Sequence, residues 1–136
     1  MKVVVIDGQG GKMGRALVES IRKQNIPCDL VAIGTNSMAT EAMLKGGAPA
    51  AATGENPVVV NAKDADVIAG PMGIIAANAL LGEVTPAMAL AVSESSALKV
   101  LIPVNRCGIF AAGTEDKTPA QYIESAVRRI AEACNA

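Results

Sequence analysis

Apolar and polar positions alternate in blocks along the chain, and these blocks predict strands and helices in turn. Residues 3–6 form a continuous run of valine and isoleucine, which is typical of a strand buried on both faces of a sheet. Residues 12–23 follow with Met13, Leu17 and Ile21 at every fourth position, which is the spacing of an amphipathic helix. The first 23 residues therefore predict a strand, a short turn and a helix.

The same alternation of apolar and polar blocks continues to the end of the chain. Further strands are expected at about residues 29–34, 57–61, 65–70 and 99–105, with a possible sixth at 108–113. Helices are expected at about 37–46, 73–83, 85–97 and 118–136, and residues 46–57 are expected to be a surface loop or hairpin. Ser37 and Thr85 are candidate helix caps, and Thr118 with Gln121 predicts a capping box.

Strands that alternate with helices indicate a mostly parallel sheet covered by helices on both faces. We therefore predict one α/β domain over residues 1–136, a three-layer Rossmann-like fold. The core is unusual, because the 136 residues include one Phe, one Tyr and no Trp. It must be filled by aliphatic side chains, and the many Ala and Gly residues allow helices to pack closely on the sheet.

Charge and cysteine content exclude several classes of protein. The net charge is −1, and the lack of a basic stripe argues against nucleic acid binding. The three cysteines show no metal-type spacing, so we predict no metal site and a reducing compartment. No signal peptide or membrane span is recognisable. We expect a cytoplasmic protein with no membrane partner.

The turn after the first strand, G-Q-G-G-K-M-G, has the composition of a phosphate-binding loop. A glycine-rich turn between a strand and a helix directs backbone N–H groups and the positive end of the helix at one point. Gly8, Gly11 and Gly14 follow the spacing G-x-x-G-x-x-G rather than the strict dinucleotide pattern. We expect a nucleotide or another phosphorylated ligand to bind at Gly8, Gln9, Gly10, Gly11, Lys12, Met13 and Gly14. The alternative is that the glycines serve only strand-to-helix packing.

The stretch GQGGKMGRAL resembles the nucleotide loop of dihydrodipicolinate reductases, which use NADH or NADPH. That resemblance covers about fifteen residues, and the histidine-bearing catalytic domain of those enzymes has no counterpart, since the chain has no histidine. As a whole, the chain resembles a family of short bacterial Rossmann-like proteins of unknown function, through DGQGG, ADVIAGPMGIIAANALLGE and KVLIPVN. This resemblance implies the fold and supplies no activity.

The end of the second strand bears on the choice of cofactor. In NAD-binding proteins an acidic residue at this place binds the ribose hydroxyls, but here the chain has Thr35 and Asn36. Without a carboxylate to repel a 2′-phosphate, NAD(P) is expected as the cofactor, with NADP slightly favoured. The alternative is that residues 35–37 only cap the next helix.

Asp7 places a carboxylate where the phosphate would arrive. Three roles are open to it. Its side chain could turn away and accept N–H bonds from the loop, which we favour. It could hold Mg²⁺ that bridges to phosphate, or it could recognise a hydroxyl or amine of the ligand.

Other strand ends at the same edge of the sheet supply further binding candidates. Gly70 and Gly73 open a second strand-to-helix turn, and Asn105 and Arg106 follow the strand at 99–105. Arg106 suits a phosphate or carboxylate. No catalytic group is assigned, because the chain lacks histidine and Cys107 has no recognisable base beside it.

The function predicted from these observations is the binding of a nucleotide, of NAD(P) type, or of another phosphorylated small molecule. One alternative is an oligomeric NAD(P)-dependent oxidoreductase. A second is a ligand-free homo-oligomeric interaction module. In each case we expect a homo-oligomer, and whether the protein is an enzyme stays open.

Overall fold

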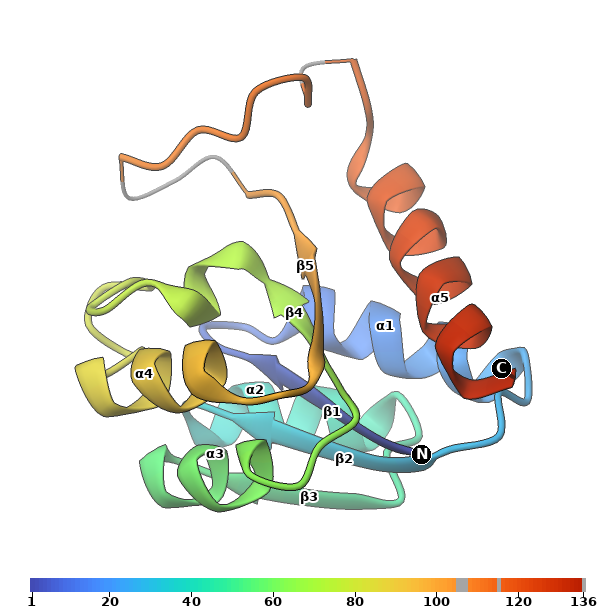
Figure 1. The fold of residues 1–136 in the computed structure, drawn as a ribbon, viewed down its shortest axis with the longest axis horizontal. Coiled ribbons are helices and arrows are strands. Elements are labelled where there is room, and N and C mark those ends of the chain that lie inside the picture. The colour runs from blue at the N-terminus through green and yellow to red at the C-terminus, as the bar shows by residue number, and fades with distance from the viewer. Residues whose placement is uncertain (105–107, 115, 136) are drawn as a thin grey trace.

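The computed structural model describes residues 1–104, 108–114 and 116–135. The described residues form one sheet of five parallel strands in the order β3–β2–β1–β4–β5 (Figure 1). The strands are β1 (Lys2–Asp7), β2 (Asp29–Gly34), β3 (Ala50–Thr53), β4 (Val67–Pro71) and β5 (Leu98–Ile102). The helices are α1 (Lys12–Lys23), α2 (Ser37–Lys45), α3 (Glu55–Ala62), the short 3₁₀ helix η1 (Met72–Ile75), α4 (Pro86–Glu94) and α5 (Pro119–Asn135).

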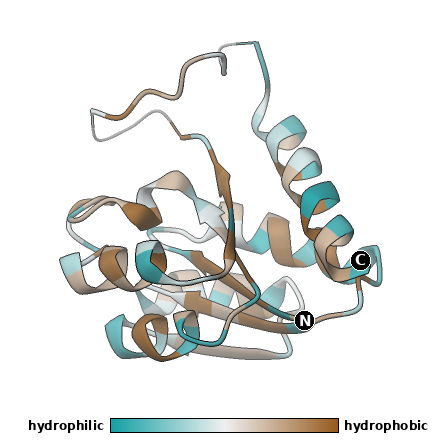
Figure 2. Cartoon of the chain, viewed as in Figure 1, coloured by the Kyte–Doolittle hydropathy of each residue, from teal (hydrophilic) through white to brown (hydrophobic). Residues whose placement is uncertain are grey.

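Helices cover both faces of this sheet, as predicted. Successive side chains of a strand point to opposite faces, so β1 contributes to two apolar clusters. Val3 and Val5 pack in the cluster that includes α1, α2 and α5, whereas Val4 and Ile6 pack in the cluster with α3 and α4. Figure 2 shows the strands mostly in the hydrophobic colour and the helices carrying hydrophilic segments as well. The three-layer Rossmann-like fold is confirmed.

Local capping chemistry explains where several helices begin. The Thr85 hydroxyl accepts a hydrogen bond from the Met88 N–H at 3.2 Å. Thr118 and Gln121 form the expected capping box, with the Thr118 N–H donating to the Gln121 side chain at 2.8 Å. The cap of α2 is Asn36 rather than the expected Ser37, because the Asn36 side chain accepts the Ala39 N–H at 2.9 Å.

The middle of the chain differs from the sequence-based expectation in two places. Residues 57–61 belong to α3 instead of a strand; Pro57 lies in the first turn of that helix, where its missing N–H is not needed. The strand of this region is β3, within residues 46–57 that were expected to be a loop or hairpin. It pairs with β2 at the edge of the sheet.

Two further expectations are wrong. Residues 73–83 do not form a regular helix, since η1 ends at Ile75 and turns follow it, with positive φ at Asn78, Leu80 and Leu81. The described residues within 108–113, expected to form a sixth strand, are in turns and irregular structure. This segment connects β5 to α5 along the outside of the molecule (Figure 1).

The strand order indicates where in this fold a ligand would bind. From β1 the chain moves outward through β2 and β3, then returns across the sheet to β4, which pairs with the other side of β1. The carboxyl ends of β1 and β4 are therefore the point at which the strand order reverses. In open α/β sheets, ligands bind in the crevice at this point.

Candidate ligand-binding site

The loop from β1 into α1 is a tight turn that depends on Gly11. The Gly11 N–H donates to the Gly8 carbonyl at 3.0 Å, and Gly11 has a φ of 71°. A Cβ atom at Gly11 would lie 2.7 Å from the Ala39 Cα. Glycine is needed here both for its conformation and for the close approach of α2.

This turn leaves backbone donors unused. The N–H groups of Gly10, Lys12 and Met13 have no hydrogen-bond acceptor among the residues that the structure describes. Lys12 and Met13 open α1, whose first N–H groups cannot have partners within the helix. Together with the positive end of the helix dipole, these donors favour an anionic group.

Asp7 occupies the inner part of the same helix end. Its Oδ2 accepts the Gly14 N–H at 2.7 Å and its Oδ1 accepts the Gly8 N–H at 2.8 Å. The side chain is only 5% exposed. A Cβ at Gly14 would lie 2.8 Å from the Asp7 Cβ, so glycine at this position allows α1 to pack so close to β1. Of the three roles open to Asp7, the structure shows the first, in which the loop N–H groups hold the carboxylate.

The pKa of Asp7 is raised above its ordinary value. Burial is the largest cause; the hydrogen bonds from the Gly14 and Gly8 N–H groups lower the pKa, and the charge of Glu83 raises it further. The two hydrogen bonds do not compensate fully for the loss of water around the carboxylate. Asp7 thus keeps its proton to a higher pH than an exposed aspartate would.

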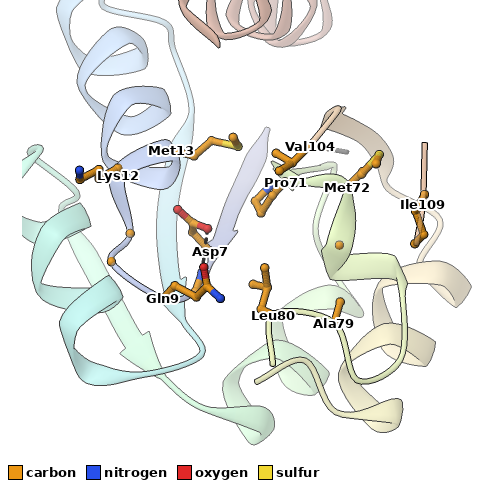
Figure 3. A pocket seen from close by; sticks show the side chains of 14 residues that line it. Asp7, Gln9, Lys12, Met13, Pro71, Met72, Ala79, Leu80, Val104 and Ile109 are labelled. Atoms are coloured by element: carbon orange, nitrogen blue, oxygen red, sulfur yellow. Dashed lines mark hydrogen bonds between the residues drawn. The ribbon is translucent and has the colours of Figure 1, made fainter. Parts of the chain in front are cut away.

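A cavity of about 290 Å³ opens above Asp7, between the glycine loop and the end of β4 (Figure 3). One side consists of residues 7–13, from the end of β1 to the start of α1, and carries the polar groups. The opposite side is apolar and is lined by Pro71, Met72, Ala79, Leu80, Val104 and Ile109. Figure 3 shows the Met13 side chain extending toward Val104 and Pro71, whereas the Lys12 side chain points away from Asp7 and the cavity. The cavity fits a ligand with an anionic end and an apolar body.

The apolar wall includes a strained loop, residues 76–84. Leu80 and Leu81 have φ values of 57° and 58°, which L-residues other than Asn and Asp adopt rarely. The Asn78 N–H donates to the Val84 carbonyl at 2.7 Å, which closes the loop. Leu80 lines the cavity, whereas Leu81 is 94% exposed. The strained backbone thus turns Leu80 toward the cavity.

Glu83 connects this loop by hydrogen bonds to the turn after β1 and to the turn after β2. Its Oε1 accepts hydrogen bonds from the Gln9 N–H at 2.9 Å, the Thr35 hydroxyl at 2.7 Å and the Asn36 side-chain amide at 2.6 Å. Desolvation raises the pKa of Glu83, but the bonds from Thr35, Gln9 and Asn36 together outweigh it and leave the pKa below its ordinary value. Glu83 is therefore ionised at neutral pH, with three donors on one oxygen.

The predicted site residues divide into four groups. Gly8, Gln9, Gly10, Gly11, Lys12, Met13 and Gly73 line the cavity, although the Lys12 side chain points away from it. Gly14 and Gly70 serve packing instead: a Cβ at Gly70 would lie 2.1 Å from the Ile6 carbonyl oxygen. Thr35 and Asn36 are bound to Glu83. Asn105 and Arg106, like Cys107, lie outside the described residues.

Three residues that line the cavity, Pro71, Met72 and Leu80, and Glu83 beside it were missed from the sequence. Pro71 and Met72 lie between Gly70 and Gly73, which were predicted as site residues, so each is adjacent in sequence to a predicted residue. Leu80 and Glu83 had been assigned to a helix end, and no local pattern marks them. Glu83 meets its partners across 47, 48 and 74 residues of chain, so only the tertiary fold reveals it.

Comparison with known proteins identifies the family. A family model described as "Domain of unknown function (DUF3842)" matches residues 2–135. The chain belongs to this family. No curated protein matches the chain. A solved structure of a dodecameric FMN-dependent UbiX-like decarboxylase from Escherichia coli O157:H7 is 14% identical, with a TM-score of 0.44 over 100% of this chain and 95% of the decarboxylase chain. None of these comparisons shows a similarity to dihydrodipicolinate reductases.

The expectation of an NAD(P) cofactor, with NADP favoured, is corrected. The similar solved structure is of a protein that depends on FMN, a flavin rather than a nicotinamide cofactor. The reason given for NADP is also wrong on structural grounds, because the end of β2 does have a carboxylate beside it. Glu83 supplies it from a distant loop, and it engages Thr35 and Asn36.

The described residues contain no helix that is long and apolar enough to cross a membrane. Within the same residues, no group of three or more His, Cys, Asp or Glu side chains is placed to hold a metal ion.

Proposed function

We propose that this protein binds a phosphorylated small molecule of about mononucleotide size. The observation that carries the proposal is the cavity at the carboxyl ends of β1 and β4, with unused N–H donors on one side and apolar side chains on the other. The phosphate lies against the N–H groups of Gly10, Lys12 and Met13. The apolar part of the ligand packs between Leu80 and Val104. A volume of about 290 Å³ is near the lower end of the range for ligand pockets.

The charge of Asp7 does not prevent this binding. Two like charges 4 Å apart repel by about 1 kcal/mol in water and about 4 kcal/mol near a protein surface. Three hydrogen bonds from N–H groups to a charged phosphate contribute about 1.5–3 kcal/mol each. The donors therefore outweigh the repulsion, provided that the phosphate uses the outer N–H groups and leaves the Gly14 N–H to Asp7.

The proposal is tested by thermal unfolding and titration calorimetry with FMN, AMP and ATP, with and without Mg²⁺. A ligand at a hundred times its Kd should stabilise the protein by about 2.7 kcal/mol. We expect FMN or a nucleotide to raise the Tm. No change with any of these compounds would contradict the proposal and would favour a ligand-free interaction module.

A matched pair of variants locates the phosphate. A side chain at Gly10 meets nothing within 4 Å, so both Gly10→Asp and Gly10→Asn should fold. Gly10→Asp adds a negative charge beside the free N–H groups and should weaken binding of the compound found above about tenfold or more, since charge repulsion is stronger away from bulk water. Gly10→Asn is the neutral control of the same size. Equal affinities for the two variants would place the phosphate elsewhere. Gly11 is unsuitable, because a side chain there would contact Ala39.

We also propose that the protein forms a homo-oligomer. Large apolar side chains lie exposed on neighbouring helices, Val60 on α3 (52% exposed) and Leu90 on α4 (57% exposed). Helices α3 and α4 pack against each other on the same face of the sheet. Light scattering coupled to size exclusion measures the molar mass directly. A mass of about 14 kDa, that of the single chain, would contradict the proposal.

A further inference from the structure

The crevice of this fold has two sides, and the structure leaves only one of them open. We propose that Glu83 restricts the site to ligands with a single nucleotide unit, because it closes the crevice on the side of β2. This inference rests on the proposed function and names the class of ligand more narrowly. It makes Glu83 a specificity-determining residue of the site.

The first observation is the use of the donors at the end of β2. In dinucleotide-binding folds, the ribose of the second nucleotide binds beside this strand end. Here the Thr35 hydroxyl and the Asn36 side-chain amide both donate to Glu83 Oε1, at 2.7 and 2.6 Å. The same Asn36 amide also donates to the Gln9 carbonyl at 3.0 Å. The polar groups that would recognise a ribose are thus bound to the protein itself.

The second observation is the lack of space above the loop. A Cβ placed on Gly8 would lie 2.5 Å from Thr35 Oγ1, 2.8 Å from Leu80 Cδ1 and 3.0 Å from Glu83 Oε1. Atoms from Thr35, in the turn after β2, and from the loop at 76–84 therefore meet directly over Gly8. Among the described residues that line the cavity, none belongs to β2 or to the turn after it. The open space extends toward β4 alone.

The third observation is the charge of this closure. Glu83 is ionised when it accepts these three bonds, and it is partly exposed. A second phosphate or a 2′-phosphate on the β2 side would meet this carboxylate and would be repelled. A ligand that extends toward β2 would also have to break the bonds of Glu83 before it could enter. The bonds of Glu83 act against any ligand that extends toward β2, and its charge acts against one that places a phosphate there. Neither effect acts on a mononucleotide on the β4 side.

The experiment compares each mononucleotide with a dinucleotide that contains it, namely FMN with FAD and AMP with diadenosine diphosphate. The measured quantity is the ratio of the dinucleotide Kd to the mononucleotide Kd, by titration calorimetry on the full chain. For the wild type we expect a ratio of about tenfold or more, because several hydrogen bonds must break. A wild-type ratio near one would overturn the inference while leaving the proposed function intact. If wild-type protein binds neither FMN nor AMP, the inference fails, and the proposed function fails with it if ATP does not bind either.

Glu83→Ala removes the closure and should lower this ratio about tenfold, because the dinucleotide gains more than the mononucleotide does. Glu55→Ala is the matched control, since Glu55 accepts a bond from Thr85 next to the same loop but none from Gln9, Thr35 or Asn36. Its ratio should equal that of the wild type. An unchanged ratio in Glu83→Ala, or an equal loss of both ligands, would show that Glu83 has a structural role only.

Glu83→Gln is a second variant that tests the same inference if Glu83→Ala does not fold. Glutamine keeps the size of the side chain and one acceptor oxygen but removes the charge. The dinucleotide should then bind about threefold or more better relative to the mononucleotide, since the charge repulsion is lost. An unchanged ratio in a folded Glu83→Gln protein would overturn the inference.

Discussion

The Gly14 N–H donates a hydrogen bond to Asp7 Oδ2 at 2.7 Å, so the positive end of α1 already holds a carboxylate of the same chain. An isolated anion in a buried place is costly, and here the helix end offsets part of that cost. The consequence for function is geometric. A phosphate cannot take the inner position that Asp7 occupies, and only the outer N–H groups of Gly10, Lys12 and Met13 remain for it.

Asp7→Asn should change how stability depends on pH. The pKa of Asp7 is raised in the folded protein, so the folded state binds its proton more tightly than the unfolded state does. Asp7 then costs stability above its folded pKa, and this cost disappears as the pH falls toward its ordinary value of 3.8. Relative to Asp7→Asn, the wild type should therefore gain stability as the solution is acidified. Urea unfolding of both proteins at a series of pH values measures this.

The prediction for Asp7 would be contradicted if the wild type lost stability relative to Asp7→Asn on acidification. That would mean that the hydrogen bonds from Gly8 and Gly14 dominate over burial. The comparison uses the difference between two proteins that share every other titrating group, so their contributions cancel.

Gly14→Ala should destabilise the protein by about 1–3 kcal/mol, the usual cost of overpacking a core. The new methyl group would lie 2.6 Å from Met43 Sδ and 2.8 Å from Asp7 Cβ. Met43 can adjust, but the Asp7 Cβ is fixed to β1, so the helix must move away from the strand. Gly10→Ala is the control, because its methyl group meets nothing within 4 Å. Equal stabilities of the two variants by chemical denaturation would refute this account.

Much of the fold was predictable because local and tertiary preferences agree there. The buried run in β1 and the spacing of Met13, Leu17 and Ile21 in α1 each indicate their element directly. The exceptions are segments in which the tertiary structure overrides local preference. Residues 50–53 form strand β3 although they are Ala-Ala-Ala-Thr, and the valines at 58–60 lie in helix α3 although they are β-branched. Residues 50–53 are a strand because they pair with β2. Residues 58–60 are helical because the chain must return from β3 to β4 across the face of the sheet.

The candidate site was predictable only where a turn defines it. Glycines at the end of β1 follow from local geometry, since Gly11 needs a positive φ. The apolar wall depends on residues 76–84, whose backbone is irregular and has no periodic pattern. Glu83 in particular reaches Gln9 and Thr35 from another part of the chain. A contact between distant residues leaves no spacing in the sequence from which it could be inferred.

Leu81→Asn should stabilise the protein by about 0.5 kcal/mol, since it relieves part of the strain of a left-handed backbone. Leu81 has a φ of 58° and is 94% exposed. Its left-handed backbone is strained, and almost no burial of the side chain offsets that strain. Asparagine tolerates this conformation better. Leu80→Asn is the informative counterpart, with a φ of 57° but a side chain in the cavity. It should weaken ligand binding. A Leu81→Asn protein that is less stable by thermal or urea unfolding would show that Leu81 is covered in solution.

Glu83→Gln should show a pH dependence opposite in sign to that of Asp7→Asn. The pKa of Glu83 is lowered in the folded protein, since the bonds from Thr35, Gln9 and Asn36 outweigh desolvation. Glu83 therefore contributes stability above its ordinary pKa of 4.5, and this contribution is lost as the pH falls through its folded pKa. On acidification the wild type should lose its advantage over Glu83→Gln while it gains on Asp7→Asn. Urea unfolding of the three proteins between about pH 3 and pH 7 gives both differences. Parallel trends would mean that the two carboxylates, one on each side of the turn at Gly8, do not have the separate roles assigned to them.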